Sequence, residues 1–299
     1  MTQTGRLLTR LDTLLDRIKT SLPGSAMRLP DPIPSALRWH NSGREHYLET
    51  VVCGQTPTLH DLLCVDRQKQ ALLDNTRQFL NGYAANHVLL CGPRGTGKSS
   101  LVKSLIAEFG NEGLVVLEVS REHLSDLPLI CRTVADLDKR FILFCDDLSF
   151  AADDNGYMDL KVMLDGSISN LPENMIIYAT SNRRHLIPEY MSENTASTVV
   201  DGEIHLHESL EEKLSLSERF GVWLSFQPFS QEQYLQICRH WLQQLGTDDI
   251  DSEQTRQAAL QWALERGSRS GRNAWQFAKD RAGKQRLRAG TPANAPASD

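Results

Sequence analysis

The chain has 299 residues, of which 40% are hydrophobic and 23% are charged, and its formal net charge is −6. This composition is typical of a globular protein with one large core or two modest ones, and it argues against nucleic-acid binding through overall positive charge. The six cysteines form no CxxC pair, and no apolar run approaches the ~18 residues of a membrane span, so we expect free thiols, no membrane partner and a cytoplasmic location.

Residues 1–58 are expected to form a mainly helical N-terminal extension that lacks the hydrophobic stretch of a secretory signal. Apolar residues recur at helical spacing from Leu7 to Ile18, which predicts an amphipathic helix that docks on a core of this chain or of a partner. Binding to a membrane surface is the weaker alternative, because acidic residues dilute the basic face. A proline-rich connector at 23–34 and a short strand at 46–52 (HYLETVV) follow.

From residue 59 to residue 229 the sequence predicts an α/β core. Helical patterns include residues 66–83, which end at Gly82, and residues 99–110. Short apolar runs typical of buried strands are HVLLC (87–91), LVVLEV (114–119), FILFC (141–145), MIIYAT (175–180) and VWLSF (222–226). Strands that alternate with helices predict a parallel sheet covered by helices on both faces.

Residues 230–288 predict a small all-helical lid. Ser230 and Gln233 have the spacing of a capping box at the start of a helix that Gly246 ends. Two more helical patterns follow, and the tail at 289–299 has nothing to bury, so we expect it to be disordered.

The segment GPRGTGKS matches the phosphate-binding pattern GxxxxGK(S/T). It follows a predicted strand and opens a predicted helix, so backbone N–H groups and a helix N-terminus would surround phosphate oxygens. Lys98 would contact the β- and γ-phosphates of a nucleoside triphosphate, and Ser99 would bind Mg²⁺. A glycine-rich turn with a surface lysine is the less favoured alternative. The predicted nucleotide-binding residues are Gly92, Pro93, Arg94, Gly95, Thr96, Gly97, Lys98, Ser99 and Ser100.

Acidic and amide side chains follow two other predicted strands. Asp146 ends the FILFC strand and is the predicted magnesium ligand, while Asp147 would polarise the attacking water. Thr180 ends MIIYAT and Asn182 follows two residues later, and the neutral amide of Asn182 could hold that water in line with the γ-phosphate. The alternatives are a solvated loop acid at Asp147 and a turn asparagine at Asn182.

Arginines in two parts of the sequence are candidates for contacts with the γ-phosphate. Arg219 stands just before the VWLSF strand, and a guanidinium is well suited to offset charge on a phosphoryl group. If Arg219 cannot reach its own phosphate-binding loop, it could complete the site of a neighbouring subunit, which requires head-to-tail assembly; a surface salt bridge is the alternative. Arg272 is the first choice for a contact from the lid, and Arg269 is the second.

The order of these segments resembles the AAA+ ATPases over roughly residues 59–288. Five segments resemble in sequence one bacterial AAA+ family of unknown function: GPRGTGKSSLVK, FCDDLSF, YATSNRRHLIPE, EKLSLSERFG and RSGRNAWQF. The resemblance implies a P-loop αβα core with a helical lid, Walker A and B roles for the loop and for Asp146 and Asp147, a sensor at Asn182 and an arginine finger at Arg219. It also implies adenine specificity, with residues 59–68 as a wall of the base site. Many AAA+ proteins carry Glu where Asp147 stands, and the shorter acid argues against brisk hydrolysis, though not against binding.

The predicted function is ATP and Mg²⁺ binding, with hydrolysis at the interfaces of a ring or helical homo-oligomer that remodels or loads an unidentified macromolecular partner. One alternative is a nucleotide-gated binding module with little turnover. Another is a helicase-loader-like protein that binds nucleic acid through the basic residues at 279–288, although a solvated helix face would show the same pattern. A metal site at HLHE (205–208) is disfavoured, because no third ligand has recognisable spacing.

Overall fold

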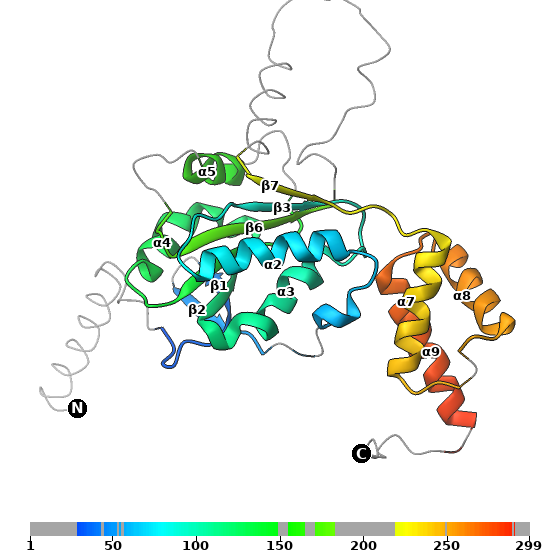
Figure 1. The fold of residues 1–299 in the computed structure, drawn as a ribbon. Coiled ribbons are helices and arrows are strands. Elements are labelled where there is room, and N and C mark those ends of the chain that lie inside the picture. The colour runs from blue at the N-terminus through cyan, green and yellow to red at the C-terminus, as the bar shows by residue number, and fades with distance from the viewer. Residues whose placement is uncertain are drawn as a thin grey trace, which may run out of the picture.

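The computed structural model describes residues 29–42, 45–52, 54, 57–148, 155–164, 171–182, 219–248, 250–288 and 290. The predicted helix at 7–18, the HLHE segment and nearly all of the predicted tail lie outside these residues. Figure 1 shows a twisted sheet with helices packed on it and, beside it, a separate group of helices formed by the end of the chain.

Within the described residues, seven strands form one sheet in the order β2-β1-β4-β5-β6-β3-β7. β1 and β2 are antiparallel, and the other neighbouring pairs are parallel. The five predicted strands are confirmed as β3 to β7. The bounds are β1 (Ala36–Asn41), β2 (His46–Thr50), β3 (Val88–Cys91), β4 (Leu114–Glu118), β5 (Arg140–Cys145), β6 (Met175–Ser181) and β7 (Val222–Ser225).

Helices cover both faces of the sheet, as the alternation of strands and helices predicts (Figure 1). Side chains alternate across β3, so that Val88 and Leu90 pack in one buried cluster with α2 and α3, while Leu89 packs in another with α4 and α5. The bounds are α2 (Asp66–Leu80), α3 (Lys98–Phe109), α4 (Leu127–Val134) and α5 (Asn155–Leu164), with 3-10 turns η1 (Leu59–Asp61), η2 (Gly110–Glu112) and η3 (Arg121–Asp126).

The expectation of a mainly helical N-terminal extension needs a correction in its described part. Residues 36–50 form β1 and β2, and the short strand predicted at 46–52 is β2. Trp39 is buried, and its indole N–H donates to Asp126 Oδ2 at 2.8 Å. β1 also pairs with β4, so this segment belongs to the sheet and not to a separate extension. Because β1 is short and follows several prolines, its sequence pattern alone does not distinguish it from a connector.

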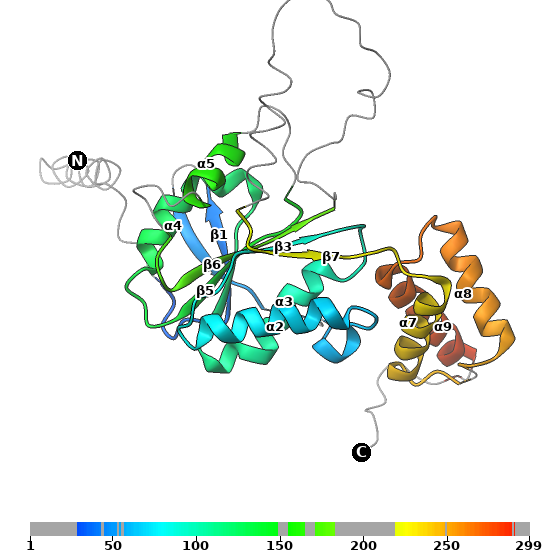
Figure 2. The same ribbon diagram turned by 45° about the horizontal axis from the view of Figure 1, so that its top comes forward.

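The lid consists of α7 (Gln231–Gln244), α8 (Glu253–Glu265) and α9 (Gly271–Arg288), which lie beside the end of β7 (Figure 2). The predicted capping box is present, because Ser230 accepts from the Gln233 backbone N–H and donates its own N–H to the Gln233 side chain. Lid residues join the same buried cluster as α2 and α3. Among the described residues, no helix combines the length and the apolar character that crossing a bilayer requires.

Candidate functional site

The loop from Gly92 to Gly97 connects β3 to α3 at the carboxyl end of the sheet. Gly92 has φ 141°, and a Cβ there would lie 2.2 Å from the Phe226 carbonyl oxygen, so only glycine fits beside the end of β7. Gly95 has φ 75°, and a Cβ there would lie 2.7 Å from the Ser270 Cβ atom. The Gly271 N–H donates to the Gly95 carbonyl at 2.8 Å. The loop is therefore held between the sheet and the first residues of α9.

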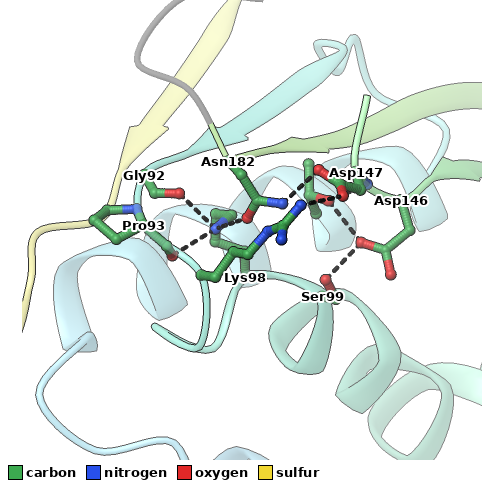
Figure 3. Close-up of polar contacts among 9 residues, drawn as sticks. Gly92, Pro93, Lys98, Ser99, Asp146, Asp147 and Asn182 are labelled. Atoms are coloured by element: carbon green, nitrogen blue, oxygen red, sulfur yellow. Dashed lines mark hydrogen bonds and ion pairs between the residues drawn. The ribbon is translucent and has the colours of Figure 1, made fainter. Parts of the chain in front are cut away.

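Lys98 begins α3, and its side chain turns back into this loop (Figure 3). Its Nζ donates to the carbonyl oxygens of Gly92 at 2.7 Å and Pro93 at 2.8 Å, and to Asn182 Oδ1 at 3.1 Å. Lys98 is only 4% exposed, and this burial lowers its pKa although Asp146 and Asp147 act in the opposite direction. An ammonium group has three N–H bonds, and all three are in use. An incoming phosphate would therefore exchange with acceptors that the protein already supplies.

Asp146 follows β5 and meets two hydroxyl groups. Its Oδ1 accepts from Ser99 Oγ at 2.5 Å and from Thr180 Oγ1 at 2.6 Å (Figure 3). These oxygen donors suit Mg²⁺, which takes one or two protein oxygens and completes its octahedron with phosphates and water. The described residues contain no group of three or more His, Cys, Asp or Glu side chains that could hold a metal ion alone. The oxygens present thus fit a magnesium ion that arrives with a nucleotide.

Asp147 is tied to the same network. Its backbone N–H donates to Thr180 Oγ1 at 2.9 Å, and its carboxylate accepts from the Asn182 amide and lies 3.5 Å from the Arg94 guanidinium. Asp147 has φ 54°, in the left-handed region where Asp and Asn are the commonest residues after glycine. This backbone conformation gives a local reason for the short acid. The Asp147 side chain is half exposed and lines the same cavity as loop residues 94–97.

A cavity of about 640 Å³ joins these groups to the lid. Its polar lining comes from loop residues 94–100 and from Asp146, Asp147, Thr180, Asn182 and Arg272. Its apolar lining comes mainly from the segment before α2 and from the lid, with Leu62, Leu63, Val65, Ile237, Trp241 and Trp275. An apolar pocket with a few convergent polar groups is the usual form of a small-molecule site. The predicted base-binding segment 59–68 therefore lies against this cavity.

The lid arginines have different positions. Arg272, in the first turn of α9, lines the cavity. Arg269 is exposed and does not line it, and the Arg266 guanidinium lies 3.4 Å from the centre of the Trp262 ring. Of the two candidates for a lid contact, this arrangement favours Arg272.

Arg219 is not brought to the cavity. It lies three positions before Val222, which pairs with Val88, whereas Gly92 lies four positions after Val88. The strands are parallel, so about four residue steps along β3, or roughly 13 Å at ~3.3 Å per residue, separate the start of β7 from the loop, and Arg219 lies in a turn before that start. No arginine side chain spans that distance. Phe220, next to Arg219, is 2% exposed and anchors the segment before β7 in the core.

Three residues near the site are not among the predicted ones. Thr180 bridges both acids, and its place at the end of β6 was its only signal. Trp241 and Trp275 come from the lid, and their ring centroids lie 4.6 Å apart. Their sequence pattern is that of ordinary helix-core residues, so nothing in it points to a pocket.

A family model described as "Protein of unknown function (DUF815)" matches residues 34–285. That range includes β1 and β2. The chain has no significant match among curated proteins.

Solved structures of RuvB from Thermotoga maritima, a Holliday junction branch migration motor, resemble the fold. One has a TM-score of 0.50 at 18% identity, covering 79% of this chain and 67% of that chain. Two single-residue variants of the same protein give TM-scores of 0.52 and 0.53 at 17% and 14% identity, covering 79% of this chain and 67% and 68% of theirs. At such identities the likeness concerns the fold. The family model spans most of the chain, so the chain belongs to the DUF815 family, whose function is unknown.

Proposed function

We propose that the protein binds ATP with Mg²⁺ in this cavity. The observation that carries the proposal is that Lys98, Ser99 and Asp146 line one pocket, where the Ser99 hydroxyl donates to the Asp146 carboxylate. The loop N–H groups and the start of α3 would hold phosphate oxygens. The apolar lining, which includes Trp241 and Trp275, has the chemistry to pack against a flat base.

Hydrolysis is the second part of the proposal. Asp147 would accept a proton from the attacking water, and Asn182, whose amide already contacts Asp147, would orient that water. Arg272 would contact the γ-phosphate from the lid. Mg²⁺, when bound by Ser99 and Asp146, would neutralise phosphate charge.

The position of Arg219 supports completion of the site by a second copy of the chain. Arg219 lies at the amino end of an edge strand, far from its own loop, whereas the transferred phosphoryl group needs a cation. In a head-to-tail ring or helix, this end of one subunit would face the cavity of the next. ATP turnover would then move the lid against the sheet and so remodel or load a macromolecular partner.

A direct test compares wild type with Lys98→Ala and Lys98→Arg. Titration with ATP and Mg²⁺, followed by tryptophan fluorescence and calorimetry, should detect binding in wild type and a loss of at least tenfold in Lys98→Ala. Steady-state ATPase activity should fall in parallel. Equal affinity and equal turnover in all three proteins would contradict the proposal, provided that circular dichroism shows each of them folded.

A nucleotide-gated binding module is the second candidate. The observation that favours it is the way Asn182 and Arg94 already engage the Asp147 carboxylate, so that both would have to release it for base catalysis. Tight ATP binding with negligible turnover in the assembled protein would support this candidate over a motor.

A nucleic-acid contact through the basic end of α9 is less favoured. Three of its cations make contacts within the lid: Arg281 donates to Thr255, Lys284 pairs with Asp280, and Arg286 donates to the Leu245 carbonyl. Salt-dependent binding to single-stranded DNA would reverse this preference.

A further inference from the structure

Lys103 lies one helical turn after Ser99, and the site described above does not use it. Residues four apart share a helix face, so the side chain of Lys103 follows that of Ser99 toward the carboxyl end of the sheet. Its Nζ lies 4.0 Å from Asp146 Oδ2 and 3.6 Å from Glu118 Oε1. Ser99 and Thr180 occupy the other oxygen, Asp146 Oδ1. The cation therefore lies beside the oxygen of Asp146 that those two hydroxyls leave open.

Glu118 is held in place by the neighbouring strand β1. The sheet register pairs Glu118 with Arg38 across one side and with Phe144, two residues before Asp146, across the other. Arg38 donates through Nε and Nη2 to Glu118 Oε2, at 3.1 and 2.8 Å, and the pKa of Arg38 is raised by this bond. One oxygen of Glu118 thus serves Arg38, while the other faces Lys103.

Four alternating charges consequently run from β1 to the proposed magnesium ligand: Arg38, Glu118, Lys103 and Asp146. We propose that Lys103 is an internal counter-cation of Asp146, shared with Glu118, and that it sets the magnesium affinity of the site. This inference rests on the proposed ATP and Mg²⁺ site. A divalent ion beside Asp146 is repelled by the ammonium group, and Glu118 relieves the repulsion by drawing that group away. Arg38 limits the relief because it competes for Glu118.

The signs of three substitutions follow. Lys103→Met removes the competing cation and should lower the Mg²⁺ concentration for half-maximal nucleotide binding, on the order of three- to tenfold. Glu118→Gln removes the second carboxylate partner of Lys103, so that its ammonium group interacts with Asp146 alone. This substitution should raise that concentration by a similar factor. Arg38→Met frees Glu118 for Lys103 and should lower it by about twofold. Each effect should shrink as salt is added, because the four groups are partly exposed.

A double-substitution cycle tests whether Glu118 acts through Lys103. The readout is Mg²⁺ titration at fixed nucleotide concentration, followed by calorimetry or tryptophan fluorescence, so turnover is not needed. Glu118→Gln should lose most of its effect when Lys103 is already Met. An equal effect in both backgrounds would mean that Glu118 acts directly on the ion, and would overturn the proposal.

Two control variants test whether the shift in Mg²⁺ affinity is specific to the charge at Lys103. Lys284→Met makes the same charge change in an ion pair on α9 and should leave the Mg²⁺ titration unchanged. Lys103→Gln serves as a second variant in case Met perturbs folding, and should shift the titration in the same direction. If wild type binds nucleotide in a Mg²⁺-dependent way, but Lys103→Met has the same Mg²⁺ concentration for half-maximal binding, only the role of Lys103 is wrong. If wild type binds no nucleotide at all, the proposed function is wrong, and the role of Lys103 with it.

Discussion

The two ends of the parallel sheet differ in what they offer to a ligand. At the carboxyl end, the phosphate-binding loop, Asp146, Asp147 and Asn182 converge on one cavity, and nearly every polar side chain there contacts another. At the amino end, Arg219 is next to the buried Phe220 and lies about a strand length from the cavity. The first end gathers the groups to which we assign triphosphate binding, and the second end carries an arginine that does not line this cavity. Under the proposed function, catalysis would require both ends, from two molecules.

The largest effect is expected at the amino end. Arg219→Ala should lower ATP turnover by about 10³-fold or more, because the charge developing on the phosphoryl group loses its guanidinium. Nucleotide affinity should stay within about twofold, since Arg219 does not line its own cavity. Arg140→Ala, another arginine at the amino end of a strand, is the matched control and should retain turnover. Full activity of Arg219→Ala would contradict a catalytic role for Arg219 at the amino end.

The carboxyl end should be most sensitive at a residue that touches both acids. Thr180→Val removes the hydroxyl that donates to Asp146 and accepts from the Asp147 N–H, and should lower turnover by roughly 10- to 100-fold. The lost bonds should also cost about 1–3 kcal/mol of unfolding free energy. Thr76→Val deletes a buried hydroxyl bonded to Tyr178, away from the cavity, and is the control. Equal turnover in the two variants would show that Thr180 is merely structural.

The amino end should also respond to pH through His87, which precedes β3. Its Nδ1 accepts from the Ile177 N–H at 3.1 Å, and burial lowers the pKa of His87 to about 4. Between pH 6.5 and 4 the unfolded chain binds the proton and the folded chain does not, so the unfolding free energy falls as pH falls, by about 1.4 kcal/mol per pH unit. Urea unfolding of wild type and His87→Gln at several pH values measures this. Parallel curves for the two proteins would contradict the assignment.

The smallest effect is expected at Arg94. Its pair with Asp147 spans 3.5 Å between exposed side chains, and such pairs contribute about 0.2–1 kcal/mol. Arg94→Gln should therefore change turnover by no more than about fivefold, and Arg94→Lys by less. Steady-state ATPase assays of the Arg94 variants and of Arg219→Ala, run side by side, measure this difference. A loss as large as that of Arg219→Ala would mean that the essential cation comes from the same chain.

The carboxyl end was largely predictable from sequence, and the amino end was not. Lys98, Asp146 and Asn182 each follow an apolar strand, and parallel strands bring their carboxyl ends to one edge whatever their order. The position of Arg219 relative to the loop depends on strand order and register, which periodicity does not encode. The same holds for Arg38 and Glu118, whose pairing needs β1 beside β4. Trp241 reaches the cavity only because the lid folds back onto the loop.

Mixing two inactive variants tests the two-molecule account most directly. Lys98→Ala keeps an intact Arg219 and Arg219→Ala keeps an intact Lys98, so a mixed assembly contains interfaces with both groups. ATPase activity measured across mixing ratios should rise well above that of either variant alone and peak at intermediate ratios. Activity that stays at the level of the separate variants at every ratio, in mixtures shown to co-assemble, would contradict the account.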